Sequence, residues 1–345
     1  MKELKTLFIV ILFVVITYLG VEPYAHSVMH PNVSPINYDF SVNDKESTQK
    51  AIENAKNAIQ SSSSKDPAIK TKLENALSMS QDKAKAYDDF WNEIKAIDLS
   101  KGNVQNGETI FSSNCVACHS MQIKGLPNPM GDAKTASESM GVAAPDLSSA
   151  GAIYTPEFLA AIITNPVLAM KVDHKFDHTY GSGVGGFFPM MAYTEMENKQ
   201  KEIADIVAFL VSVAPKNLTD KEIFESACDR CHDMKYAKIY TQGNKNSVAN
   251  YLGTTPPDLS QMIRSKNKKY LHEFMNDPQK LLTGTAMPRV GLNADAQEKI
   301  VSYMEKIGDS KKEEREKTTI NIMIYFVILS VFAYLFKRKV WRDLH

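Results

Sequence analysis

The longest uninterrupted apolar stretch covers residues 318–336, nineteen positions without a charged side chain. As a helix, a segment of this length extends about 28 Å, which matches the roughly 30 Å hydrocarbon core of a bilayer. Four basic residues lie among the next six positions, 337–342. Because basic flanks stay on the cytoplasmic side, the pattern predicts a transmembrane helix at 318–336 and a cytoplasmic basic tail at 337–345.

A second apolar run, residues 7–21, follows Lys2 and Lys5. As a helix it would extend only about 23 Å, so it is typical either of a secretion signal or of a short membrane anchor. Pro23 occupies a position where a signal cleavage site needs a small residue, which slightly favours the anchor. We therefore assign residues 1–25 to a signal or an N-terminal membrane anchor. Either would deliver the middle of the chain across a membrane.

Residues 26–102 form a polar segment with helical patterns at 47–59 and 68–97. Four serines at 61–64, followed by Pro67, interrupt these patterns. In the second pattern, mainly apolar residues recur at helical spacing and form a weak stripe. They are Leu73, Leu77, Ala84, Tyr87, Trp91 and Ile94. We expect a helical hairpin that packs on the rest of the chain or on a partner subunit.

All four cysteines belong to two copies of the pattern C-x-x-C-H, at residues 115–119 and 228–232. This pattern is the attachment signature of c-type haem: two thiols add to the vinyl groups, and the adjacent histidine ligates the iron. A thioredoxin-like redox pair does not need the histidine, and a zinc site would have to join knuckles more than a hundred residues apart. The sequence thus predicts two covalently bound haem c groups. The predicted attachment and ligand residues are Cys115, Cys118 and His119 for the first, and Cys228, Cys231 and His232 for the second.

The two haem motifs are part of a longer internal repeat. The string Pro-Asp-Leu-Ser follows each motif, at residues 145–148 and 257–260. A further proline, Pro166 or Pro278, lies 21 residues beyond the first proline of each string, and an apolar helical run precedes it. The chain therefore contains two related modules in tandem.

These motifs resemble class I cytochromes c over residues 103–308. The resemblance implies an all-α chain: two tandem class I cytochrome c domains, at 103–215 and 216–310, with an N-terminal helical segment and terminal membrane helices. In this family a helix begins each domain and another ends it. The helices that begin the domains are expected to start near Asn106 and Leu218. Those that end the domains are expected at 201–213 and 294–307.

The resemblance also implies how the two irons are held. In class I cytochromes a methionine lies opposite the histidine, and a proline carbonyl accepts a hydrogen bond from that histidine. For the second haem this methionine is Met287, in the string Thr-Ala-Met-Pro. The corresponding prolines are Pro145 and Pro257. A methionine that only fills the core and an ordinary Pro-Asp turn are the alternative interpretations.

The first module departs from the family pattern, because it has about fifteen more residues before its methionine. Met190 best matches the expected ligand, although Met191 follows it where the family has proline. The insertion also contains His174 and His178, which could ligate the first iron, form a surface metal pair or lie on a solvated helix face. We prefer Met190 and keep Met191 and the two histidines as alternatives.

Within the dihaem cytochromes, the chain resembles the cytochrome c1-type subunit of bacterial quinol–cytochrome c reductases, the bc1 complexes. Besides the haem motifs, the C-terminal span with its basic tail and the segment 21–26 carry this resemblance. It implies electron transfer from a Rieske iron–sulfur protein to a soluble cytochrome c, without a catalytic residue in this subunit. The implied partners are cytochrome b and the Rieske subunit in a dimeric complex, together with membrane lipid and no nucleic acid. The haem domains would lie on the periplasmic side of the bacterial inner membrane.

Other functions are compatible with two haem modules, since a single-haem cytochrome c1 has only one such motif. One is the dihaem subunit of a cbb3-type oxidase, which typically has only an N-terminal anchor. Another is a free membrane-tethered carrier, and a third is a dihaem peroxidase, which needs an open or bis-histidine iron. The whole chain has a formal charge of zero, but residues 103–215 carry −5 and residues 216–310 carry +2. The acidic first module would either steer a basic soluble cytochrome or be an ordinary solvated surface.

Overall fold

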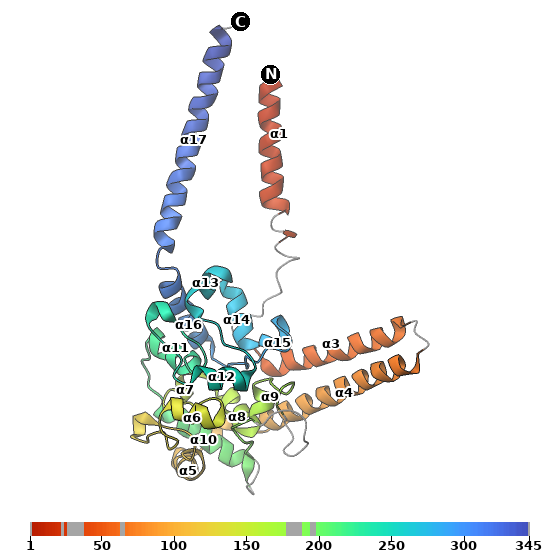
Figure 1. Cartoon of the computed structure of the whole chain (residues 1–345), viewed down its shortest axis with the longest axis vertical. Coiled ribbons are helices and arrows are strands. Elements are labelled where there is room, and N and C mark those ends of the chain that lie inside the picture. The colour runs from red at the N-terminus through yellow and green to blue at the C-terminus, as the bar shows by residue number, and fades with distance from the viewer. Residues whose placement is uncertain are drawn as a thin grey trace.

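The computed structural model describes residues 2–21, 24–25, 38–62, 66–176, 188–193 and 198–343. Within these ranges every regular element is a helix, and extended pairing is limited to three isolated β-bridges. The expected all-α fold is therefore confirmed. Figure 1 shows a helical body from which the hairpin of α3 (Phe40–Ser61) and α4 (Pro67–Lys95) projects to one side. Two helices, α1 (Lys2–Ile16) and α17 (Lys312–Asp343), project from it in another direction.

The two terminal helices differ in length. Among the described residues, only Lys312–Arg342 is a helix long and apolar enough to cross a membrane. The apolar helix near the other end covers Lys5–Val21 and is shorter. Both extend in the same direction, so the first and last described residues lie at the same end of the molecule (Figure 1). Large apolar side chains are exposed along both helices.

Ion pairs hold the start of α17 to the helix before it, α16 (Ala294–Gly308). The Arg315 guanidinium donates two hydrogen bonds of 2.7 Å to the Asp309 carboxylate, and Lys312 pairs with Glu305 at 2.6 Å. These hydrogen bonds from Arg315 hold the pKa of Asp309 below its usual value. The junction therefore fixes where the apolar helix leaves the body.

The predicted hairpin is present, and both of its helices start where an aspartate caps them. Asp39 accepts hydrogen bonds from the backbone of Ser41 and Val42, and α3 consequently begins seven residues before the predicted position. Asp66 caps α4 in the same way, with Pro67 in the first turn. The end nearest the body buries Phe40, Tyr87, Phe90, Trp91 and Ile94 in one core cluster with the first module. The expectation that the hairpin packs on the rest of the chain is confirmed.

The two modules consist of matching helices in the same order. The first contains α5 (Val104–Ile110), α6 (Ala133–Met140), α7 (Ala150–Ile153), α8 (Pro156–Thr164), α9 (Pro166–Ala169) and α10 (Lys199–Val213). The second contains α11 (Asp220–Cys228), α12 (Lys245–Leu252), α13 (Met262–Ser265), α14 (Lys268–Asn276), α15 (Pro278–Leu281) and α16. The predicted starts of α5 and α11 and the predicted ranges of α10 and α16 match the structure to within about two residues.

In each module the first helix packs against the last, α5 against α10 and α11 against α16. Each of these two helix contacts is accompanied by one pair of aromatic rings. Phe111 lies 5.3 Å from Phe209 between ring centroids, and Phe224 lies 5.5 Å from Tyr303. In the first module the backbones approach so closely that a Cβ at Gly107 would lie 1.9 Å from the Asp205 carbonyl oxygen. Only glycine fits at that position.

Asp205 joins the two crossing helices of the first module. Its buried carboxylate accepts hydrogen bonds from the Asn103 backbone (2.6 Å) and the Asn106 side chain (2.5 Å). Burial alone would raise the pKa of Asp205, but these hydrogen bonds and Lys201 hold it below its usual value. We expect Asp205→Asn to lower the free energy of unfolding by about 2 kcal/mol at neutral pH, because charge-assisted hydrogen bonds are lost.

The free energy of unfolding lost in Asp205→Asn should become smaller as the pH falls. A carboxylate whose folded pKa is depressed contributes stability above its unfolded pKa, near 3.9, and loses it as the pH falls through the folded value. Chemical denaturation at several pH values should therefore show the difference between the two proteins shrinking as the pH falls below about 4. A difference that stays constant as the pH falls further would contradict the assigned role of the charge.

Equivalent helices of the two modules meet at their interface. α6 contacts α12, where the Asn244 backbone donates to the Ser137 hydroxyl at 2.7 Å and its side chain donates to Glu138 at 2.8 Å. A Cβ at Gly141 would lie 2.3 Å from the ring of Tyr251. The modules therefore form one body with a continuous interface.

Candidate functional site

Each haem motif begins at the last residue of the helical segment that opens its module and forms a single turn. The His119 amide donates to the Cys115 carbonyl at 2.9 Å, and the His232 amide donates to the Cys228 carbonyl at 2.9 Å. The turn brings both thiols of a motif and its histidine together within five residues. All four cysteines are free and partly buried.

Burial affects the protonation of the first thiol in each motif. Burial raises the pKa of Cys115 to about 11 and that of Cys228 to about 12. Within the described ranges, no three histidine, cysteine or acidic side chains form a group that could hold a metal ion. The zinc alternative therefore finds no support.

The imidazole of each motif is oriented by a proline carbonyl, as the resemblance implies. His119 Nδ1 lies 2.9 Å from the Pro145 carbonyl oxygen, and His232 Nδ1 lies 2.8 Å from that of Pro257. A carbonyl only accepts, so Nδ1 must carry the proton and Nε2 of a neutral ring carries the lone pair. Burial lowers the pKa of both histidines, which favours this neutral form. Each ring is thereby prepared to ligate iron through Nε2.

The remaining residues of the first Pro-Asp-Leu-Ser string fasten it to the backbone after the haem motif. Asp146 accepts from the Gln122 amide at 2.9 Å, and Ser148 Oγ accepts from the Ile123 amide at 3.1 Å. The Leu147 amide donates to the Ser120 carbonyl at 3.0 Å. Every residue of the string thus has a partner that fixes the position of the Pro145 carbonyl.

The second string repeats these contacts at equivalent positions. Asp258 accepts from the Lys235 amide at 3.3 Å, and Ser260 Oγ accepts from the Tyr236 amide at 3.0 Å. The Leu259 amide donates to the Asp233 carbonyl at 2.9 Å. Two modules with different surrounding sequences therefore build the same hydrogen-bonded frame around their histidines.

Sequence reasoning missed one further part of this frame. Two residues after each histidine a fully buried methionine, Met121 or Met234, forms a β-bridge with Leu126 or Ile239. The signal was present as the longer pattern C-x-x-C-H-x-M in both copies. These methionines anchor the loop that follows the haem motif, and their burial at this bridge marks them as core residues.

Two buried donors near the motifs have no hydrogen-bond partner in the described part of the chain: Arg230 Nε and the Tyr251 hydroxyl. Arg230 lies inside the second haem motif. The pKa of the Tyr251 hydroxyl is raised, first by burial and then by the nearby Cys231 thiolate, so Tyr251 lies close to this motif. Asp229 Oδ1 is a buried acceptor that likewise has no hydrogen-bond partner in the described part of the chain, and burial raises the pKa of that carboxyl to about 6. Unpaired buried donors are costly. Together with the thiols and the prepared imidazoles, they fit a haem, whose propionates accept hydrogen bonds.

The candidate distal residues occupy two loops. Met287 is half-buried, and its amide donates to Thr285 Oγ1 at 3.3 Å. In the first module Met190 is also half-buried, whereas the side chain of Met191 is 64% exposed. Tyr193, three residues after Met190, packs in the same core cluster as Cys115. The loop that contains Met190 therefore passes the first haem motif.

Of the two histidines in the insertion, the structure describes only His174. His174 Nε2 lies 3.1 Å from the Thr285 carbonyl oxygen, to which it donates, and so contacts the methionine loop of the second module. This bond does not favour His174 as a ligand of the first iron. His178 lies outside the described residues.

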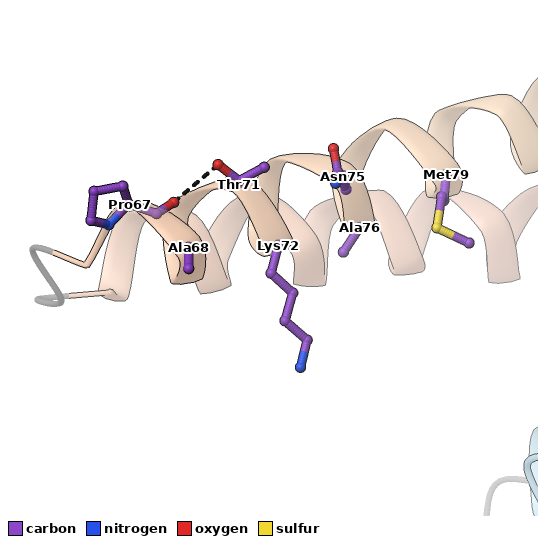
Figure 2. A pocket seen from close by; sticks show the side chains of 7 residues that line it. All are labelled: Pro67, Ala68, Thr71, Lys72, Asn75, Ala76 and Met79. Carbon is purple, nitrogen blue, oxygen red and sulfur yellow. Dashed lines mark hydrogen bonds between the residues drawn. The ribbon is translucent and has the colours of Figure 1, made fainter.

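A shallow hollow on the outer part of α4 is unrelated to the haem motifs. Figure 2 shows it on the projecting hairpin, and its lining residues are Pro67, Ala68, Thr71, Lys72, Asn75, Ala76 and Met79. The Thr71 hydroxyl donates to the Pro67 carbonyl of its own helix at 3.0 Å. The Thr71 hydroxyl is thus engaged within its own helix, and the other polar lining residues are Lys72 and Asn75.

Comparison with known proteins identifies one family. Residues 104–214 match the family model described as cytochrome c. No curated protein matches the chain. Among solved structures, a chain titled "Hyperthermophilic respiratory Complex III" is similar, with 21% identity over 36% of this chain and 75% of that one, and a TM-score of 0.28. Residues 104–214 thus form a cytochrome c domain, a family whose members bind haem c covalently.

Proposed function

We propose that this protein is a membrane-anchored dihaem cytochrome c of a quinol–cytochrome c reductase. In this proposal it accepts electrons from a Rieske iron–sulfur protein, next to cytochrome b, and passes them to a soluble cytochrome c. The observation that carries the proposal is the duplicated frame in which Pro145 and Pro257 each hold Nδ1 of a motif histidine.

The residues of each module have defined roles toward the group. Cys115 and Cys118 attach the first haem and Cys228 and Cys231 attach the second, while His119 and His232 present Nε2 to iron. Met190 and Met287 would be the methionine ligands of the two irons, and the half-buried position of Met190 supports it over the more exposed Met191. When bound, haem c supplies a one-electron iron couple whose potential depends on these ligands, their hydrogen bonds and burial.

The membrane arrangement follows from the two projecting helices. Both extend from the body in one direction, and the ends of both are basic, with Lys2 and Lys5 in one and four basic residues at 337–342 in the other (Figure 1). The positive-inside rule then favours both ends in the cytoplasm and the haem modules on the periplasmic side. This geometry supports residues 1–25 as a retained anchor rather than as a cleaved signal.

The C-terminal helix favours the reductase over the oxidase interpretation. The dihaem oxidase subunit that the modules also resemble typically has only an N-terminal anchor, whereas here Lys312–Arg342 is the longer apolar helix. A tethered carrier without partner subunits would share the same anchor. Co-purification separates the three functions.

The test is extraction of the native protein in mild detergent, followed by reduced-minus-oxidised spectra of everything that co-purifies. We expect haem b and haem c in about equal amounts, an iron–sulfur signal, and reduction of haem c by quinol. Haem b together with copper and oxygen consumption would instead assign the chain to an oxidase. Haem c alone would leave a tethered carrier and contradict the proposal.

A further inference from the structure

We propose that Asp44, on the N-terminal hairpin, positions Met287 through Arg289 and thereby sets how firmly Met287 ligates the second haem. This inference rests on the proposed ligation of that haem by Met287. It concerns a segment that lies outside both cytochrome modules and contains no residue of the haem motifs. Asp44 and Arg289 are positioning residues, because neither has to touch the haem.

The contact between the two residues is buried and bidentate. Arg289 Nη2 donates to Asp44 Oδ1 at 2.5 Å, and Arg289 Nη1 donates to Asp44 Oδ2 at 2.9 Å. Both side chains have no exposed surface. Trp91 of α4 also donates to Asp44, at 3.0 Å, so both helices of the hairpin hold the carboxylate in place. Two parallel charge-assisted hydrogen bonds fix orientation as well as distance.

The cluster around this pair is balanced in charge. Lys171, from the loop after α9, pairs with Asp44 at 3.1 Å and with Asp277 at 2.6 Å. Two acidic and two basic side chains from the hairpin, the first module and the second module therefore meet in the interior. Removal of one charge leaves the others uncompensated, so their arrangement is sensitive to each member.

Arg289 is also immobilised through its backbone and through its guanidinium stem. Its amide donates to the Met170 carbonyl at 2.9 Å, and its Nε donates to the Asn276 carbonyl at 3.0 Å. The following residue, Val290, donates to the Met275 carbonyl at 3.0 Å. The chain at this point is thus held between the first module and the end of α14.

Only Pro288 separates this fixed point from Met287. Because the proline ring fixes φ, movement of Arg289 is transmitted to Met287 with little slack. On the other side, the Thr285 carbonyl accepts hydrogen bonds from His174 at 3.1 Å and from Gln279 at 2.6 Å. The segment that contains Met287 is therefore fixed on both sides, at the Thr285 carbonyl and at Arg289. Each of these two points has a contact from outside the second module.

This arrangement makes the ligation of the second haem depend on the hairpin. Groups that hold a metal ligand in place typically change metal affinity 10- to 100-fold when they are mutated. Loss of the Asp44 charge should loosen Arg289 and with it the methionine loop, so that an external ligand replaces Met287 more easily. The first haem, whose methionine lies in a different loop, should be unaffected.

The test is imidazole binding to the ferric full-length holoprotein, compared between the unmodified protein and Asp44→Asn. We expect imidazole to bind the second haem about tenfold more tightly in the variant, with a weaker thioether-to-iron absorption band and a lower midpoint potential for that haem. The matched control is Asp89→Asn on the same hairpin, where the carboxylate forms an exposed pair with Lys85 and should leave all three readouts unchanged.

A conservative variant covers the case in which Asp44→Asn does not fold. Arg289→Lys keeps the charge but loses the planar fork, and we expect a change in imidazole affinity of the same sign. Unchanged affinity, band and potential in either folded variant that retains two haems would overturn the inference while leaving the proposed function intact. A holoprotein without a methionine-ligated second haem would instead show failure of the proposed ligation.

Discussion

In a Met287→Ala variant we expect the thioether-to-iron absorption band of the second haem to disappear. We also expect its midpoint potential to fall by on the order of 0.1–0.3 V, a fraction of the roughly 0.8 V that axial ligands span. The reason is that a thioether opposite imidazole favours the reduced iron, whereas water or hydroxide does not. Redox titration followed in the visible spectrum measures both changes.

Met191→Ala is the appropriate comparison, since that side chain is 64% exposed and is not the preferred ligand of the first haem. We expect it to leave both haems unchanged, whereas Met190→Ala should change the first haem alone. An unchanged spectrum in Met287→Ala would refute the assignment of this residue. A change in Met191→Ala but not in Met190→Ala would move the first ligand by one position.

The second large effect concerns stability. We expect Arg289→Met to lower the free energy of unfolding by about 3–5 kcal/mol, because it leaves buried carboxylates without their partner. Burial alone would raise the pKa of Asp44, and it is Arg289 and Lys171 that hold it below its usual value. Guanidinium denaturation followed by circular dichroism measures the loss, and the exposed Lys85→Met is the control that should show no measurable change.

A double variant separates the cost of an unpaired buried charge from the cost of changed side-chain packing. Asp44→Leu combined with Arg289→Met removes both charges of the bidentate pair, and we expect it to be more stable than Arg289→Met alone. If the double variant loses the sum of the free energies lost by Asp44→Leu and by Arg289→Met alone, the pair is not energetically coupled. That outcome would contradict the role we assign to the buried network.

The sequence predicted the haem motifs and the approximate positions of the module helices, because each depends on residues close together in the chain. The role of the Pro145 and Pro257 carbonyls was implied by the resemblance to class I cytochromes c. The turn of C-x-x-C-H is local, and the proline strings could be found because they occur twice. The capping residues Asp39 and Asp66 could also have been found, since an aspartate before a helical pattern is a local signal.

The charge cluster could not be predicted in this way. Asp44 and Arg289 are 245 residues apart, and each alone has the appearance of an ordinary surface charge in the sequence. Their contact exists only because the hairpin packs on both modules near Met170 and Asn276. Likewise, nothing in the sequence indicated that His174 would contact the loop of Met287 rather than remain available to the first iron.

The central claim is that both modules carry covalently bound haem, although the matched cytochrome c family model covers only residues 104–214. The most direct measurement is the intact mass of the native full-length chain, together with its iron content. We predict that the mass exceeds that of the polypeptide by two haem groups and that the iron content is two per chain. Replacement of Cys228 and Cys231 by serine should reduce both values to one. A native chain with a single haem, unchanged by that replacement, would contradict the account.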